Sequence, residues 1–147
     1  MEPTVCRVVP YVEAEAAIQQ IRRLVFQIEQ QVDPALDFDG LDPAAQHILA
    51  YQQDQAVGTA RIRRLDSAIV KLERVAVLAD FRGQGIGQQI IQTALSWLVA
   101  QAIFDCKLHA QTQTVPFYQK LGFTPEGEEF YEAGIPHSAM YWRYGLA

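Results

Sequence analysis

The chain has 147 residues, of which 50% are hydrophobic and 20% are charged, and its formal net charge is −5 at pH 7. This length fits one domain, 1–147, with a sizeable core. No apolar run approaches the ~18–20 residues of a membrane span. The acidic balance argues against non-specific nucleic-acid binding, which needs a basic face. The first residues do not resemble a secretory signal. We therefore expect a cytoplasmic protein that binds neither nucleic acid nor membrane.

The first half of the sequence predicts strands around one helix. Residues 5–9 form a short strand-like run, and apolar residues at three- and four-residue steps from 13 to about 30 predict an amphipathic helix. The acidic segment 33–43 contains two prolines and Gly40, so we expect an irregular surface segment with room for a helical turn. Three strands follow as a meander, at 47–51, 57–63 and 68–78.

A glycine-rich segment then leads into a second helix. Apolar residues recur on one helical face from the glycines to near residue 103. The remaining elements are a strand at 106–111, a short helix at 115–121 and a closing strand pair at 123–131 and 139–144. This order predicts an α+β fold in three layers, with a mixed, mostly antiparallel central sheet flanked by helices.

The segment Arg82-Gly83-Gln84-Gly85-Ile86-Gly87 lies between a predicted strand and a predicted helix. Unpaired N–H groups and the positive end of the helix dipole bind phosphate at such a place, and glycines let the backbone approach the anion. The spacing Gly-x-Gly-x-Gly does not fit the dinucleotide fingerprint Gly-x-Gly-x-x-Gly, because Gln88 stands where the next glycine would be. No Walker lysine is present either. The alternative is an ordinary glycine-rich turn that caps a helix.

The pattern Arg-x-x-Gly-x-Gly after a hydrophobic strand resembles the GCN5-related N-acetyltransferases (GNAT), and within them a small bacterial branch. Residues 117–123, which include Tyr118, resemble the aromatic-Tyr-x-x-x-Gly-Phe segment of that family. Residues 22–30 and 129–140 extend the resemblance over nearly the whole chain. One departure is that Gln111 or Gln113 stands where many relatives place an asparagine near the cofactor.

The resemblance implies the GNAT-like acyl-CoA N-acyltransferase fold, with acetyl-CoA or coenzyme A as co-substrate and no metal ion. In that fold strands 71–78 and 106–111 splay apart, and the cofactor completes the sheet. Backbone groups of Val75 and Val77, on either side of Ala76, would bond the pantetheine amides. The pyrophosphate would lie on the loop, chiefly on its backbone N–H groups. The loop residues are Arg82, Gly83, Gln84, Gly85, Ile86, Gly87 and Gln88.

The implied reaction is direct attack of a primary amine on the thioester in a ternary complex. An alkyl amine is almost wholly protonated at pH 7, so a base must accept a proton. Glu73 is the candidate base, because two-residue alternation puts it on one face with Val75 and Val77. Its alternative role is a surface salt bridge with Arg61 or Arg63.

Tyr118 resembles the family tyrosine that faces the coenzyme A sulfur, where it would protonate or hydrogen-bond the departing thiolate. The alternative for Tyr118 is a core tyrosine. Cys6 and Cys106 are expected to be buried free thiols.

Several residues have open roles. His137 is either an acceptor-binding or a structural residue, and we expect His47 and His109 to be structural. The acidic residues at 37, 39 and 42 could attract a cationic amine, although a solvated loop is the preferred interpretation. The runner-up function is a non-catalytic acyl-CoA-binding or regulatory module, and acyl-homoserine-lactone synthesis ranks below it. The acceptor stays open between a small-molecule and a peptide amine, and the assembly between a monomer and a homodimer.

Overall fold

The computed structural model describes residues 3–145 and shows strands and helices in the predicted order. The strands are β1 (Thr4–Pro10), β2 (Gln46–Gln52), β3 (Gln55–Arg64), β4 (Ile69–Val77), β5 (Asp105–Gln111), β6 (Thr124–Pro125), β7 (Phe130–Glu132) and β8 (Ile135–Arg143). The helices are α1 (Tyr11–Arg22), its π-helical continuation η1 (Arg23–Glu29), α2 (Pro34–Asp37), α3 (Ile86–Ala100) and α4 (Val115–Lys120). Two short 3₁₀ turns complete the set, η2 (Ala79–Phe81) and η3 (Thr112–Thr114).

All eight strands form one sheet in the order β1-β2-β3-β4-β5-β8-β6, with β7 also paired to β8. Within residues 3–145, the only parallel neighbours in this order are β4 and β5. A parallel pair needs a crossover connection, and α3 supplies it. The predicted mixed, mostly antiparallel sheet is therefore confirmed.

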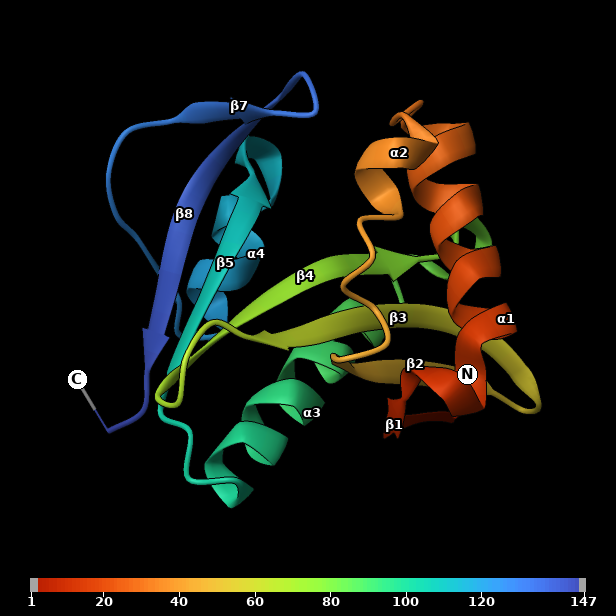
Figure 1. Ribbon diagram of the computed structural model, residues 1–147, viewed down its shortest axis with the longest axis horizontal. Helices are drawn as coiled ribbons and strands as arrows, with labels where there is room; N and C mark the ends of the chain where they lie inside the picture. Colours follow the sequence, from red (N-terminus) through yellow and green to blue (C-terminus); the bar gives the residue numbers. More distant parts are fainter. Residues whose placement is uncertain (1–2, 146–147) are drawn as a thin grey trace.

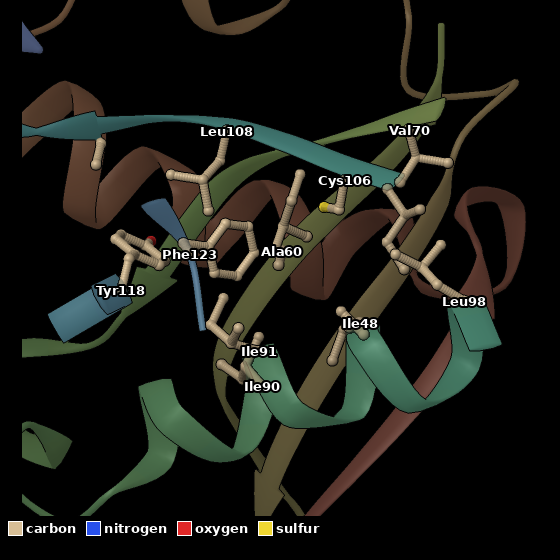
Figure 2. Close-up of a cluster of buried hydrophobic side chains, with 14 of the residues drawn as sticks. Ile48, Ala60, Val70, Ile90, Ile91, Leu98, Cys106, Leu108, Tyr118 and Phe123 are labelled. Atoms are coloured by element: carbon tan, nitrogen blue, oxygen red, sulfur yellow. The ribbon is translucent and has the colours of Figure 1, made fainter. Parts of the chain in front are cut away.

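Helices cover both faces of the sheet, as Figure 1 shows. The larger core lies between the sheet and the α3–α4 side, and it is filled by isoleucines and leucines of α3 together with inward side chains of the strands. Figure 2 shows this core, with Tyr118 and Phe123 toward one end and Val70 and Leu98 toward the other. A smaller core on the opposite face joins α1 to Leu49 and Ala76. Among residues 3–145, no helix is both long and apolar enough to cross a membrane.

The C-terminal strands differ most from the prediction. The run 123–131 holds two short strands instead of one, because Gly127 turns the chain with φ +84° after Glu126 N–H has bonded Ala139 O at 2.9 Å. Strand β8 begins at Ile135 and not at 139. A two-residue turn with positive φ at Ala133 (52°) and Gly134 (74°) joins β7 to β8. The backbone twist of such a turn matches the twist of the two strands that it connects.

Candidate active site

The parallel pair β4–β5 opens into a fork. Its register runs from Ile69 opposite Asp105 to Leu72 opposite Leu108, and no pair follows. Figure 1 shows the two strands diverging beyond this point. The predicted splay is confirmed. A cavity of about 950 Å³ opens at the fork and reaches from the α3 glycine loop to the inner side of η1, α2 and the β7–β8 hairpin.

A β-bulge in β4 decides which side chains share a face at the fork. Arg74 has φ +54°, and the β3–β4 register shifts beside it. After the bulge, Val75 and Val77 pack against the α3-side core, whereas Ala76 belongs to the core under α1. Glu73 instead contacts Arg61 on the α1 side. The prediction that Glu73 shares a face with the two valines is wrong, because the extra residue reverses the alternation.

The fork leaves backbone groups of β4 without a neighbouring strand. Leu78 N–H donates to Val57 O of β3 at 2.9 Å, so alternation turns the N–H and C=O groups of Val77 and Val75 toward the fork. The Val77 carbonyl accepts a hydrogen bond from Arg82 Nε at 3.0 Å. The polar backbone of Val75 and the N–H of Val77 therefore face the space where β5 has departed, which suits an extended chain of amides.

The glycine loop forms a cradle at the start of α3. Gly83 and Gly85 have φ +79° and +80°, and a Cβ built on either would have no atom within 4 Å. Helix α3 begins directly after Gly85, so its first N–H groups lack helical partners. The open space beside the glycines and the unpaired donors fit a pyrophosphate. The predicted cofactor residues that line the cavity are Val75, Ala76, Val77, Arg82, Gly83, Gly85, Ile86, Gly87 and Gln88.

Two predicted loop residues direct their side chains elsewhere. Gln84 is not among the cavity residues, because its Oε1 accepts a 2.7 Å hydrogen bond from Gln52. The Arg82 guanidinium forms an ion pair with Glu29 of η1, with Nη2 2.7 Å from Oε1. The cradle therefore offers mainly backbone N–H groups.

Tyr118 lies on the wall of the same cavity and is 8% exposed. Its ring stands edge-on to Phe117, with centroids 5.0 Å apart, and to Phe123, with centroids 5.8 Å apart. Burial raises the pKa of Tyr118 above its ordinary value, so the hydroxyl stays protonated at neutral pH. The ring is thus part of the core. A hydroxyl in this position also has the protonation state needed to donate to a thiolate.

Two of the three aspartates expected in a solvated loop before β2 are buried, which corrects the sequence-based interpretation for Asp37 and Asp42. Asp37 and Asp42 are 2% and 4% exposed. Arg22 of α1 binds both carboxylates, at 2.9 Å and 2.6 Å, and it is itself completely buried. Arg61 of β3 binds Asp42 at 3.0 Å and Asp39 at 2.8 Å. Two arginines from separate elements thus pair with Asp37 and Asp42 in the interior, whereas Asp39 stays exposed to solvent.

Glu73 is the end of this ion-pair network. Its carboxylate lies 2.6 Å from Arg63 Nε, 3.1 Å from Arg61 Nη2 and 3.5 Å from Lys71 Nζ. Burial by itself would raise the pKa of Glu73, but the hydrogen bond from Arg63 and the surrounding positive charges outweigh it, and the pKa is lowered. The salt bridges proposed as the alternative role are therefore present. They also make this carboxylate a weak proton acceptor.

The histidines divide into two settings. His47 is buried, and its Nε2 lies 3.0 Å from Asp42 O, which agrees with the expected structural role. His109 and His137 line the cavity, and between them stands Glu132, which the sequence analysis did not select. The hairpin turn before β8 brings these side chains together. Among residues 3–145, no three His, Cys, Asp or Glu side chains are grouped closely enough to hold a metal ion.

The cysteines are not paired. Cys106 is buried in the α3-side core, as expected, and Cys6 is half-buried on β1. Neither residue lines the cavity.

This architecture is similar to that of known proteins. The family model described as "Acetyltransferase (GNAT) domain" matches residues 13–144. The uncharacterized N-acetyltransferase YjcF of Bacillus subtilis (strain 168) is 41% identical over 122 residues, which cover 82% of this chain and 86% of that protein. The crystal structure of Escherichia coli ElaA superposes with a TM-score of 0.85 at 31% identity, covering 95% of this chain and 99% of that one.

A third structure adds a ligand to the comparison. The GNAT family acetyltransferase from Elizabethkingia anophelis, crystallised with acetyl-CoA bound, has a TM-score of 0.70 and 16% identity, and covers 95% of this chain and 97% of that one. At this identity the likeness concerns the fold. Taken with the forked sheet, the glycine cradle and the family match over residues 13–144, these similarities show that the chain belongs to the GNAT acetyltransferase family.

Proposed function

We propose that this protein transfers the acetyl group of acetyl-CoA to a primary amine of a small molecule or peptide, by direct attack in a ternary complex. The observation that carries the proposal is the fork beyond Leu72 and Leu108, which opens into a single cavity shared by the glycine cradle, the free edge of β4 and Tyr118. The acetyl-CoA bound to the structural neighbour from Elizabethkingia anophelis supports the same co-substrate.

The residues present fit coenzyme A. The cradle formed by Gly83 and Gly85 has space beside each Cα and unpaired N–H groups for a pyrophosphate. The free backbone edge at Val75 and Val77 would hold the pantetheine amides. When bound, acetyl-CoA supplies a thioester carbonyl carbon that an amine can attack. The cavity walls would orient both partners, and the Tyr118 hydroxyl, kept protonated by burial, would donate to the sulfur.

The test is incubation of the purified protein with acetyl-CoA and a panel of primary amines. Released thiol is measured by colorimetry, and the acetylated product is identified by mass spectrometry. The proposal requires thiol and N-acetyl product in equal amounts. Tight binding of acetyl-CoA without turnover on any amine would favour the runner-up, a non-catalytic acyl-CoA-binding module.

We extend the proposal to a cytoplasmic protein without nucleic-acid or membrane partners, because the net charge is −5 and no apolar run is long enough to span a membrane.

A further inference from the structure

We propose that Glu132 and His137 form the binding site for the acceptor amine, and that Nε2 of His137 takes the proton which the amine loses. This inference rests on the proposed acetyl transfer, but it concerns the opposite wall of the cavity from the glycine cradle. Glu132 is the last residue of β7, and His137 lies on β8 just beyond the turn.

The sheet register brings the group together. His137 pairs with Gln111 of β5, and His109 pairs with Ala139 of β8, so alternation puts both histidines on one face. The opposite face carries Leu108 and Met140, which fill the α3-side core. The two histidines and Glu132 therefore point to the acceptor side of the fork, and all three line the cavity.

Hydrogen bonds determine which nitrogen of His137 is free. Its Nδ1 lies 2.7 Å from the carbonyl oxygen of Ile135. A carbonyl oxygen only accepts hydrogen bonds, so Nδ1 carries the proton in the neutral ring and Nε2 keeps its lone pair. The side chain is 9% exposed, and the Phe130 ring stacks beside it with centroids 6.1 Å apart. The imidazole is thus held in one orientation.

Glu132 offers a second acceptor that faces the first. Its Oε1 accepts a 3.0 Å hydrogen bond from Nδ1 of His109, while Oε2 lies 3.7 Å from Nε2 of His137. This separation is too long for a hydrogen bond between them, yet two bonds of ~2.9 Å from one nitrogen can span it. A protonated amine carries hydrogen-bond donors and a positive charge, which complement these two acceptors. The hydrogen bond from His109 lowers the pKa of Glu132, so the carboxylate is charged at neutral pH.

The proton balance favours His137 over Glu73. An imidazole ordinarily titrates near pH ~6.5, closer to an alkyl ammonium than a carboxylate does. Glu73 has a lowered pKa and is bound by Arg61 and Arg63. In the proposed transfer the N–H bond of the ammonium breaks, its electron pair stays on the nitrogen, and the proton bonds Nε2. The positive charge then lies on the imidazolium beside the Glu132 carboxylate, which stabilises it.

The first test uses imidazole ¹⁵N NMR spectra of the whole protein and needs no turnover. The chain has only 3 histidines, so single substitutions assign every signal. His47 is the internal control, because its Nε2 contacts the Asp42 carbonyl and its ring should carry the proton on Nε2. His137 should carry it on Nδ1 at pH 8. Addition of n-butylamine should shift the His137 Nε2 signal and leave His47 unchanged, and n-butanol should shift neither.

The matched variant is Glu132→Gln, which keeps the size of the side chain and removes its charge. It should weaken the n-butylamine response at least tenfold. A His137 ring that stays doubly protonated up to pH 9, or an amine response equal in wild type and Glu132→Gln, would overturn the inference.

The second test is kinetic. His137→Asn keeps an N–H donor near the Ile135 carbonyl and removes Nε2 together with the rest of the imidazole ring, so kcat should fall about 10²-fold or more while acetyl-CoA affinity is unchanged. The acidic limb of the pH–rate profile should change in this variant and not in Glu73→Gln. The other titratable groups around the pair are His109 on β5 and Lys71 on β4. If His137→Asn kept both the wild-type kcat and the acidic limb of the pH–rate profile, His137 would not be the proton acceptor.

The two proposals can fail separately. If wild-type protein bound n-butylamine at His137 but never released thiol from acetyl-CoA, acetyl transfer would fail and the amine site would stand. If thiol release were normal while both tests on His137 gave no effect, only the amine site would be refuted.

Discussion

The two walls of the cavity are built in different ways. The cofactor wall consists of backbone: a free strand edge at Val75 and Val77, and a glycine cradle with open space where side chains would be. The opposite wall, called the acceptor wall after the proposed amine site, consists of polar and charged side chains from distant segments. The β7–β8 hairpin contributes Glu132 and His137, while Arg22 and Arg61 hold Asp37 and Glu73 in a buried network. A site built from backbone groups suits a co-substrate that is common to a whole family. In a site built from side chains, substitutions can change the substrate specificity without changing the fold. The difference predicts that damage to the first wall abolishes binding, while damage to the second affects folding or rate.

The largest effect is expected from Gly85→Asp. The change puts a carboxylate beside the pyrophosphate site and strains a backbone with φ +80°, so acetyl-CoA binding should be lost. Isothermal titration calorimetry measures it. Gly127→Asp is the matched control, because Gly127 has φ +84° with the same open space but lies outside the cavity. Equal affinities in the two variants would mean that the cradle does not hold the cofactor.

Tyr118→Phe tests a hydroxyl on the wall of the cavity. The variant keeps the ring packing and removes the hydroxyl, and a positioned acid typically contributes ~10²–10⁴-fold, so kcat should fall within that range. Acetyl-CoA affinity and Tm should change little. A thioester with a better leaving group should recover part of the rate. Tyr141→Phe, outside the cavity, is the control. A variant that loses stability but keeps its rate would show that Tyr118 is only a core residue.

Arg61→Met should destabilise the acceptor wall. The residue is fully buried between Asp39, Asp42 and Glu73, and removal of one partner from a buried ion pair typically costs ~3–5 kcal/mol. Chemical denaturation measures the loss. Arg143→Met is the control, since its ion pair with Glu126 is exposed and should contribute little. A similar decrease in the free energy of unfolding in both variants would show that burial does not increase the contribution of the ion pairs to stability.

The same network predicts acid sensitivity. The pKa values of Asp42 and Glu73 are lowered in the folded state. The unfolded chain therefore binds more protons below about pH 4, where free carboxyls titrate, and stability falls as the pH drops. Tm should be lower at pH 3 than at pH 6. The decrease should be smaller in Arg61→Met, which removes a cause of the low pKa values. An equal decrease in both proteins would place the acid-sensitive groups elsewhere.

The smallest effect is expected from Glu29→Gln. Glu29 holds Arg82 in an exposed ion pair, with side chains 42% and 43% exposed, and such pairs contribute little. Release of Arg82 should raise acetyl-CoA affinity by about threefold or less, because the guanidinium then becomes available to the pyrophosphate. Glu126→Gln, which removes the exposed ion pair with Arg143 outside the cavity, should leave affinity unchanged. A weaker affinity in Glu29→Gln would show that the ion pair helps to shape the cradle.

The cofactor wall and the fold class could be predicted from the sequence because their signals are local. Alternating and 3.6-residue periods mark the strands and α3, and the glycines that permit positive φ stand in one short segment. The departure of β5 from β4 followed from the family resemblance, and the register confirms it. Each of these features depends on residues close together in the chain or on a pattern shared by relatives.

The acceptor wall was decided by the tertiary structure. The bulge at Arg74 reversed the faces of the residues after Glu73, and strict alternation cannot anticipate an inserted residue. The sequence predicted that Asp37 and Asp42 lie on the surface. In the fold, Arg22 and Arg61 from other elements form ion pairs with them. The cost of burying a charge depends on its partner, and a partner far away in sequence is specified only when the chain has folded.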